Sequence, residues 1–245
     1  MLTLAALPDV PEIKPGDDLA AILGAAANRL DGGLHPTDVL AVAHKVVSKA
    51  EGRVVRLAEV FPGWRAHELA EQHGKDPHHM QVILDEAEEI LRADRGRIIC
   101  RTRHGFVCAN AGVDASNAGR PGTVVLLPED PDASARALRH ELGCAIVITD
   151  SFGRPWRHGQ AEVAIGCAGL VPAEDWRGQT DADDRELSAT VIAIADEVAA
   201  AADLVRGKDT REPAVRARGL GRYVTAEDGA GAAALIRPPE DDLFR

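Results

Sequence analysis

At the centre of the sequence stands RTRHGFVCANAGVDASN, which runs from Arg101 to Asn117. Apolar residues 98–100 lead into it, and polar and apolar residues then roughly alternate, which predicts a strand. Two arginines and a histidine crowd its start, and a loop with a carboxylate, a hydroxyl and two amides closes it. Fixed cations beside hard oxygen ligands suit phosphoryl transfer with Mg²⁺ or Mn²⁺. A hairpin with a solvated turn is the plainer interpretation, and composition does not decide between the two.

Length and charge narrow the function class. The chain has 245 residues and a net charge of −11. We expect one domain over residues 1–245 with ample core and a frayed tail over residues 238–245. The acidity argues against a general binder of nucleic acid or of anionic membranes. No apolar run of about 18 residues and no basic amino-terminal segment occur, so we expect a cytoplasmic location. Four widely spaced cysteines without C-x-x-C predict buried free thiols rather than a zinc site.

Hydrophobic patterning predicts both helices and strands along the chain. The expected helices cover Asp17–Leu30, Trp64–Gly74, Pro77–Asp94, a segment capped by Asp132 or Ser134 that ends at Leu142, and Glu186–Val205. The expected strands cover Val39–Ala43, Thr123–Leu127, Cys144–Thr149 and Pro213–Ala217. The run Cys144–Thr149 is apolar on both faces, which predicts a central strand. Asp150 and Ser151 follow it, at the end of a strand where ligands gather in open α/β sheets.

Four clusters contain side chains that could do chemistry. The first comprises His44, Lys45, Ser48 and Lys49. It is a phosphate cradle if its lysines share a helical face, and a plain charged surface otherwise. The second is the central stretch. The third, Asp150–Gln160, joins an acid and a hydroxyl to two arginines that suit phosphate oxygens. The fourth is Arg206–Arg211.

The common nucleotide-binding motifs are missing. A P-loop near Arg206–Arg211 would need glycine at Ala202 and a hydroxyl residue at Asp209. A dinucleotide fingerprint at Gly219 would need glycine at Val224. The sequence also has no G-x-S-x-G elbow and no H-E-x-x-H pattern. We therefore expect no P-loop, no Rossmann motif and no covalent nucleophile, but a site rich in cations and hard oxygen ligands.

The central stretch resembles the signature of the coenzyme F420:L-glutamate ligases, the F420-0 γ-glutamyl ligase family. Three other parts of the chain resemble the family in the same order, and together the likeness spans about residues 7–221. These parts are Ser48–Arg53, Asp150–Arg157 with Ala164–Gly169, and Ala195–Val205.

The resemblance implies a ligase that forms an amide bond at the expense of GTP. The terminal carboxylate of the deazaflavin coenzyme precursor F420-0 would become an acyl phosphate, with GDP released. The amine of L-glutamate would then displace phosphate, and further rounds would add γ-linked glutamates. The resemblance also implies two divalent ions, Mg²⁺ or Mn²⁺, assistance by K⁺ and a homodimer. The fold that it implies is α/β (mixed α+β), with mixed sheets and flanking helices.

The resemblance also assigns residues. It implies metal ligation by Asp114, Asp150 and Ser151. The candidate catalytic cations, which would stabilise the charge that shifts during transfer, are Arg101, Arg103, Arg154 and Arg157. The residues expected to bind the nucleotide are Val10, Pro11, Glu12, Ile13, His44, Lys45, Lys49, Asn117, Arg206, Gly207, Lys208, Asp209, Thr210, Arg211, Glu212 and Pro213. Lys208 departs from the family, whose members can place an acidic or amide metal ligand there. Either fewer protein groups hold the second ion, or the ammonium takes over part of its role.

Two other function classes are consistent with the same residues. A metal-dependent phosphohydrolase or nucleotidyl-transferring enzyme would turn over GTP without glutamate or deazaflavin. A non-catalytic nucleotide-binding module would bind GTP and release no phosphate.

Overall fold

The computed structural model describes residues 1–242 and has the mixed α/β architecture expected from the sequence. In chain order its strands and helices are β1 (Thr3–Ala6), α1 (Leu19–Ala27), β2 (Val39–Ala43), α2 (His44–Ala50), β3 (Val54–Arg56), α3 (Trp64–His73), α4 (Pro77–Glu86), β4 (Ala87–Asp94), β5 (Arg97–Thr102), β6 (Val107–Ala109), β7 (Thr123–Val125), α5 (Pro131–Leu142), β8 (Ala145–Gly153), β9 (Gln160–Ala168), β10 (Glu174–Asp175), β11 (Val191–Ile192), α6 (Ile194–Asp203) and β12 (Ala214–Arg218). Short 3-10 turns are η1 (Leu57–Glu59), η2 (Asn110–Gly112), η3 (Ala232–Leu235) and η4 (Pro239–Asp241).

A five-stranded sheet in the order β1-β12-β2-β8-β9 forms the centre of the larger half. β2 and β8 run parallel, from the pair Val39 and Ala145 to the pair Ala43 and Thr149, and the other neighbours are antiparallel. Unbroken apolar runs predict both strands, because a strand covered on both faces needs apolar residues at every position. β8 is an interior strand, as expected, with β2 and β9 on either side.

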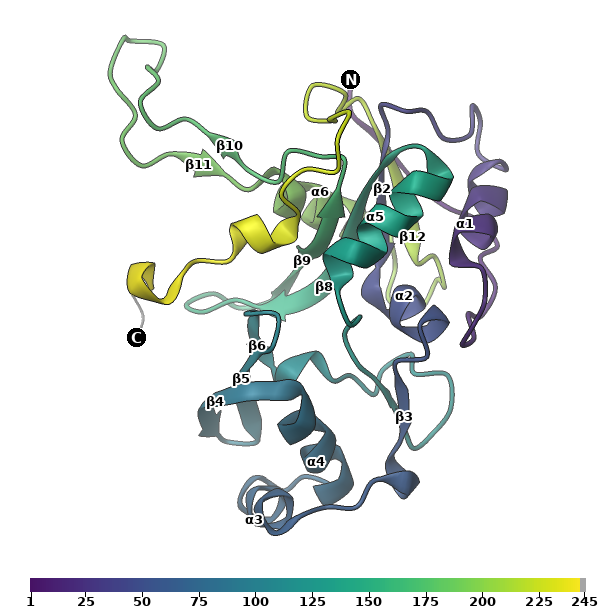
Figure 1. The fold of residues 1–245 in the computed structure, drawn as a ribbon, viewed down its shortest axis with the longest axis vertical. Helices are drawn as coiled ribbons and strands as arrows, with labels where there is room; N and C mark the ends of the chain where they lie inside the picture. The colour runs from purple at the N-terminus through teal and green to yellow at the C-terminus, as the bar shows by residue number, and fades with distance from the viewer. Residues whose placement is uncertain (243–245) are drawn as a thin grey trace.

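Successive side chains of these strands enter two different hydrophobic cores. Leu40 and Ile146 pack on the face covered by α1, α2 and α5. Val39 and Ala145 pack on the opposite face, against α6. Figure 1 shows the sheet between these two helical layers. The period-two alternation of a strand therefore produces three layers from one continuous apolar sequence.

A smaller half lies beneath this sheet in Figure 1 and is built around its own core, which includes Met80, Ile83, Ile98 and Val124. It contains α3, α4, the pair β3-β7 and the sheet β4-β5-β6. The central stretch of the sequence folds here as the β5-β6 hairpin, followed by η2 and a loop to Asn117. β6 also contacts β8. The stretch therefore joins the two halves of the molecule.

The prediction of one helix over Pro77–Asp94 is wrong beyond Glu86. β4 begins at Ala87 and pairs with β5 in an antiparallel hairpin. Arg95 and Gly96 connect the two strands, and their φ angles are 49° and 76°. Two successive positive φ angles are typical of a two-residue hairpin turn. The acidic residues of β4 pair with an arginine of β5 instead of covering a solvated helical face.

Two other predicted helices begin elsewhere. The segment Glu186–Val205 is helical only from Ile194, because residues 174–192 form the projecting hairpin β10-β11 (Figure 1). α5 begins at Pro131, and its N-cap is Asp130, which accepts a 2.9 Å bond from Ala133 N, rather than Asp132 or Ser134. Proline suits the first helical position because its missing N–H has no partner there. Of the predicted frayed tail, residues 239–241 form η4 and residues 243–245 lie outside the described residues.

The cysteines are buried free thiols, as expected. Burial raises the pKa of Cys100 to about 11, and the pKa of Cys108, Cys144 and Cys167 to about 12. These groups therefore offer no thiolate nucleophile near neutral pH. Within residues 1–242, no helix combines the length and the apolar character needed to span a bilayer.

Candidate active site

Polar side chains begin where the parallel pairing of β2 and β8 stops. The last pair joins Ala43 to Thr149, and His44 then opens α2 while Asp150 continues β8. The sequence predicts that the strand ends at Thr149, but β8 runs on to Gly153 along β9. The end of the parallel pairing is where ligands bind in open α/β sheets. This edge is the candidate site.

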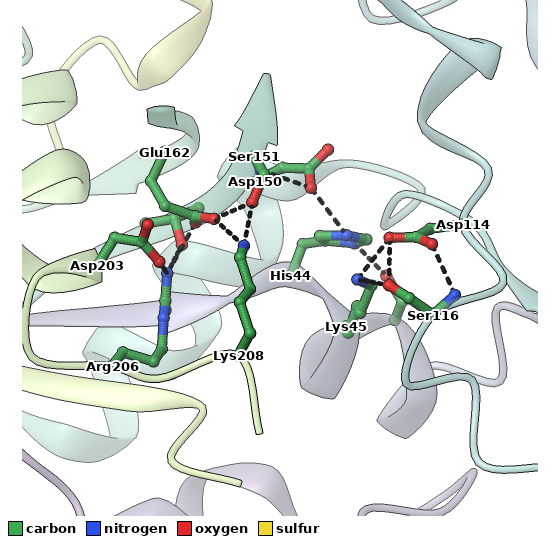
Figure 2. Close-up of polar contacts among 12 residues, drawn as sticks. His44, Lys45, Asp114, Ser116, Asp150, Ser151, Glu162, Asp203, Arg206 and Lys208 are labelled. Atoms are coloured by element: carbon green, nitrogen blue, oxygen red, sulfur yellow. Dashed lines mark hydrogen bonds and ion pairs between the residues drawn. The ribbon is translucent and has the colours of Figure 1, made fainter. Parts of the chain in front are cut away.

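Ser151 and Glu162 face each other across β8 and β9. Ser151 Oγ donates to Glu162 Oε1 over 2.5 Å, and Lys208 Nζ donates to Ser151 Oγ over 2.8 Å (Figure 2). Lys208 Nζ also lies 3.9 Å from Glu162 Oε1, and the Glu162 side chain is only 5% exposed. A carboxylate this buried needs cations and hydrogen bonds to stay ionised. Lys208 therefore neutralises part of an oxygen-rich group.

Arg206 is the second cation on this carboxylate. Its Nη2 lies 2.7 Å from Glu162 Oε2 and 3.0 Å from Thr149 Oγ1, and 8% of its side chain is exposed. Asp203 is a more distant partner, with its carboxylate 3.9 Å away. Arg206 thus holds Oε2 of Glu162 in place, and Oε1 of Glu162 faces Ser151.

His44 and Asp150 lie in the middle of the site. His44 Nε2 is 3.2 Å from Asp150 Oδ1, and their side chains are 3% and 15% exposed. His44 Nδ1 is 3.4 Å from Ser48 Oγ. Within the described chain, Nε2 is a buried atom without a hydrogen bond of good geometry. Such an atom in a native site calls for a partner, and a bound ligand supplies one.

Asp114 forms a separate oxygen group with Ser116. Lys45 Nζ lies 2.6 Å from Asp114 Oδ2 and 3.1 Å from Ser116 Oγ, and Ser116 donates to the carboxylate from both N and Oγ. Burial raises the pKa of Asp114, but the hydrogen bonds and charge of Lys45 and the bonds from Ser116 outweigh it, so the net shift is downward. In Figure 2 this group and the Glu162 group lie on either side of His44.

Comparison with known proteins identifies the family. The model of the family described as F420-0:Gamma-glutamyl ligase matches residues 9–219. This chain belongs to that family. Its relatives include three proteins named coenzyme F420:L-glutamate ligase. The protein of Methanopyrus kandleri is 46% identical, over 100% of this chain and 98% of its own length. Those of Methanothermobacter thermautotrophicus and Natronomonas pharaonis are 43% and 45% identical, over 100% and 98% of this chain and 99% and 93% of their own lengths.

The amino-terminal residues expected to line the nucleotide site fall into a buried pair and an exposed pair. Val10 and Ile13 are buried in the sheet core, whereas Pro11 and Glu12 are exposed. Glu12 Oε1 lies 2.5 Å from Nζ of Lys49 in α2. Asn117 is exposed, with a φ of 52°. Glu12 thus links residues 10–13 to the site through Lys49, and the buried side chains of Val10 and Ile13 anchor this segment in the core.

Residues 206–213, which were expected to bind the nucleotide, lie between α6 and β12. Arg206 and Lys208 reach the Glu162 group, although the Lys208 side chain is 71% exposed. The residues Gly207, Asp209, Thr210 and Arg211 are also exposed. Glu212 and Pro213 are half-buried. Arg206 Nη1 also donates to Pro213 O over 3.4 Å, which closes the segment into a loop.

We call the Glu162 group, the His44–Asp150 pair and the Asp114 group together the catalytic cluster. The four arginines expected to be catalytic do not contact this cluster through any side-chain bond described for residues 1–242. Arg101 pairs with Glu89 at 2.9 Å and Arg103 pairs with Glu86 at 2.6 Å, both in the smaller half. Arg154 donates to His158 O over 2.7 Å at the exposed tip of the β8-β9 hairpin, which also holds exposed Arg157. The cations that do contact the cluster are Lys45, Arg206 and Lys208.

Sequence reasoning missed Glu162 and Asp203 as members of the site, and it counted Ser116 only as a hydroxyl of the central stretch. Glu162 is a lone acid inside an apolar run, which is a signal in itself, because an unpaired carboxylate is costly in a buried strand. Ser116 follows Asp114 by two residues, a spacing typical of a side chain that bonds the backbone N–H two residues on.

Proposed function

We propose that this protein is a GTP-dependent ligase that joins L-glutamate to coenzyme F420-0 through a γ-linked amide. An acyl phosphate on the F420-0 carboxylate is the activated intermediate, GDP and phosphate are the by-products, and further γ-glutamates can follow. The observation that supports this most is the match along the whole chain to proteins named coenzyme F420:L-glutamate ligase. The site agrees with it, since it gathers carboxylates, hydroxyls and cations, and the proposed acyl phosphate needs no enzyme nucleophile.

We assign the nucleotide phosphates to the cations that surround His44. Lys45 and Lys49 approach from α2, and Arg206 and Lys208 approach from the loop before β12. Ammonium and guanidinium groups held in place stabilise the charge that develops during phosphoryl transfer, because they need no reorganisation at that moment. The remaining nucleotide contacts are assigned to the exposed residues of segments 10–13 and 207–213, and to Asn117.

The donor atoms of the site fit Mg²⁺ or Mn²⁺. Ser151 and Glu162 bring two side-chain oxygens together, with the Asp150 carboxylate bonded to the neighbouring Ser151 N–H, and Asp114 with Ser116 forms a second oxygen set. Within residues 1–242 no group of three or more His, Cys, Asp or Glu side chains is close enough to hold an ion alone. Mg²⁺ commonly uses one or two carboxylates and completes its shell with substrate phosphates and water. Each set would hold one ion, which would neutralise phosphate charge when bound.

Lys208 has two roles in this proposal, both of which depend on its positive charge. Its ammonium contacts the oxygens of Ser151 and Glu162, where a metal ion would otherwise supply positive charge. Lysine binds phosphate as a point charge. We therefore assign Lys208 to the nucleotide phosphates and to partial charge neutralisation of the Glu162 group.

From the same family likeness we propose a cytoplasmic homodimer, one ligase domain in the whole chain, and assistance by K⁺. The four arginines Arg101, Arg103, Arg154 and Arg157 are proposed as cations that approach the substrates from the β5-β6 turn and the β8-β9 tip. Light scattering at working concentration tests the dimer, since a monomeric mass contradicts it.

The deciding experiment incubates the protein with GTP, Mn²⁺, L-glutamate and F420-0 and follows the products by mass spectrometry. We expect F420-0 to gain γ-linked glutamate, with one GDP per addition, and little product when ATP replaces GTP. Release of GDP at the same rate without glutamate and F420-0 would instead identify a phosphohydrolase. Binding of GTP without any phosphate release would identify a nucleotide-binding module.

A further inference from the structure

A cavity of about 450 Å³ lies between residues 232–242 and the strands β6, β8 and β9. Residues 232–242 run beside β9 in Figure 1, where they are drawn in yellow. Asp132 holds this segment in place, because its Oδ1 accepts bonds of 2.8 Å from both Cys167 N of β9 and Ala232 N. Small-molecule sites in proteins measure roughly 300 to 1,000 Å³. The cavity therefore has the size of a ligand site with a fixed wall.

The walls of the cavity suit a flat aromatic ring. Phe106 and Phe152 line it, with ring centroids 6.2 Å apart and planes at 77°. His104 stacks on Phe106 at 5.7 Å and 25°. Ile236 and Pro238 form part of the opposite wall. Aromatic rings bind other aromatic rings by stacking and by edge contacts, beyond the burial of apolar area.

A cation lies at the same cavity. Arg101 lines it from β5, and one guanidinium nitrogen, Nη2, is held 2.9 Å from Glu89. Within residues 1–242, the side-chain contacts described for this guanidinium all go through Nη2, to Glu89 and Glu88. A guanidinium carries five N–H donors in a fixed fork. Arg101 therefore has donor capacity left for an anionic group beside the aromatic wall.

The cavity adjoins the catalytic cluster. Phe152 follows Asp150 by two residues on β8, so the two side chains project from the same face about 7 Å apart along the strand. A molecule seated against Phe152 with an extended anionic tail can therefore reach Asp150. We propose that this cavity binds the deazaflavin ring of F420-0, that Arg101 binds an anionic group of its tail, and that the terminal carboxylate is thereby directed to the cluster. The proposal rests on the proposed function and names the subsite of its acyl substrate.

The test measures binding of F420-0 by its own fluorescence, without GTP or glutamate, so that it does not depend on ligation. Ile236→Trp fills the cavity and should raise the Kd for F420-0 about tenfold or more, which corresponds to the loss of one well-formed contact. Phe152→Leu keeps apolar volume and removes the ring, and should raise the Kd about three- to tenfold. Leu2→Trp places the same bulk at an exposed position outside the cavity and should change nothing.

Steady-state kinetics separate this proposal from the proposed function. Both cavity variants should raise the KM for F420-0 and leave the KM for GTP within about twofold. If both variants fold and their Kd and KM for F420-0 equal those of the wild-type protein, the cavity assignment is overturned and the ligase function stands. If the wild-type protein forms no glutamyl product but binds F420-0, and Ile236→Trp weakens that binding, the proposed function fails and the ring site stands. Thermal melts check folding, and Phe152→Leu decides if Ile236→Trp does not fold.

Discussion

Replacing Glu162 by alanine should destabilise the protein strongly, because it leaves Arg206 as a buried charge. The two side chains are 5% and 8% exposed and their nearest charged atoms are 2.7 Å apart. Removing one partner of a buried ion pair costs about 3 to 5 kcal/mol. Asp203, 3.9 Å from the guanidinium, retains part of the counter-charge, so we take the lower end, about 3 kcal/mol. For a chain of this size the melting temperature should fall by about 6 to 12 °C.

Urea and thermal unfolding, followed by circular dichroism, measure this loss. A matched control is Glu68→Ala, which removes an ion pair of similar length, 2.6 Å to Arg65, whose side chains are 42% and 51% exposed. That variant should lose no more than about 1 kcal/mol, because exposed pairs are screened by water. Glu162→Gln keeps an acceptor for Arg206 and should fall between the two.

The double variant Glu162→Leu with Arg206→Met isolates the coupling between the charges. Removing both partners of a buried pair is often neutral, so the double variant should be more stable than Glu162→Ala alone. The reasoning is refuted if Glu162→Ala loses less than about 1 kcal/mol of stability. It is also refuted if the stability loss of the double variant equals the sum of the losses of Glu162→Leu and Arg206→Met measured singly.

Three other predictions follow from the same geometry. Asp150→Ala should fold and lose about 10²-fold or more in ligase turnover, measured at saturating Mn²⁺, because the site loses a hard oxygen ligand. Lys208→Ala should raise the GTP requirement and lower turnover, whereas Lys208→Glu should shift the Mn²⁺ dependence upward; kinetics across a Mn²⁺ titration measure both. Asp38→Asn should cost about 2 kcal/mol at pH 7 in urea unfolding, because a neutral amide with a single oxygen replaces the carboxylate that accepts two charged bonds from Arg218, at 2.8 and 2.7 Å. Burial raises the pKa of Asp38, but bonds and charge from Arg218 and a bond from His35 N lower it further, so the net shift is below 3.8. That stability is present above pH 3.8 and is lost as the pH falls through the folded-state pKa, so the gap between wild type and Asp38→Asn should close in acid.

Each of these predictions has an outcome that contradicts it. Near wild-type turnover of Asp150→Ala would remove Asp150 from the metal set. Unchanged GTP and Mn²⁺ dependence in both Lys208 variants would make Lys208 a surface residue. If the difference in free energy of unfolding between wild type and Asp38→Asn is constant from pH 7 to pH 3, the negative charge of Asp38 contributes nothing to stability.

The parts of the fold that the sequence predicts are those that depend on local pattern. The apolar runs at Val39–Ala43 and Cys144–Thr149 are short and rich in β-branched residues, which favours strands covered on both faces over helices. The position of Asp150 and Ser151 after such a run is likewise visible in the sequence. Lys208 was expected near the phosphates, and it does reach the oxygens of this group.

The parts that the sequence does not reveal depend on register and on distant partners. Glu162 meets Ser151 only because the β8-β9 hairpin has this register, which includes an irregularity between Ile148 and Thr149. Nothing local fixes that register. The acids after Glu86 fit a helical face as well as a strand, and their pairing with Arg101 of β5 decides between the two. The two-residue signal Arg95–Gly96 was the one local sign of the hairpin.

The order of the large sheet also determines when the molecule can fold during synthesis. β1, at residues 3–6, pairs with β12, at residues 214–218, and β12 also separates β1 from β2. The ribosome must therefore add roughly 200 residues before β1 gains its neighbour, which takes on the order of 10 to 40 s at 5 to 20 residues per second. During that time the edges of β1 and β2 that β12 later covers lack their final partner and can pair with other chains. We expect the nascent protein to need chaperone protection until Arg218 has left the exit tunnel.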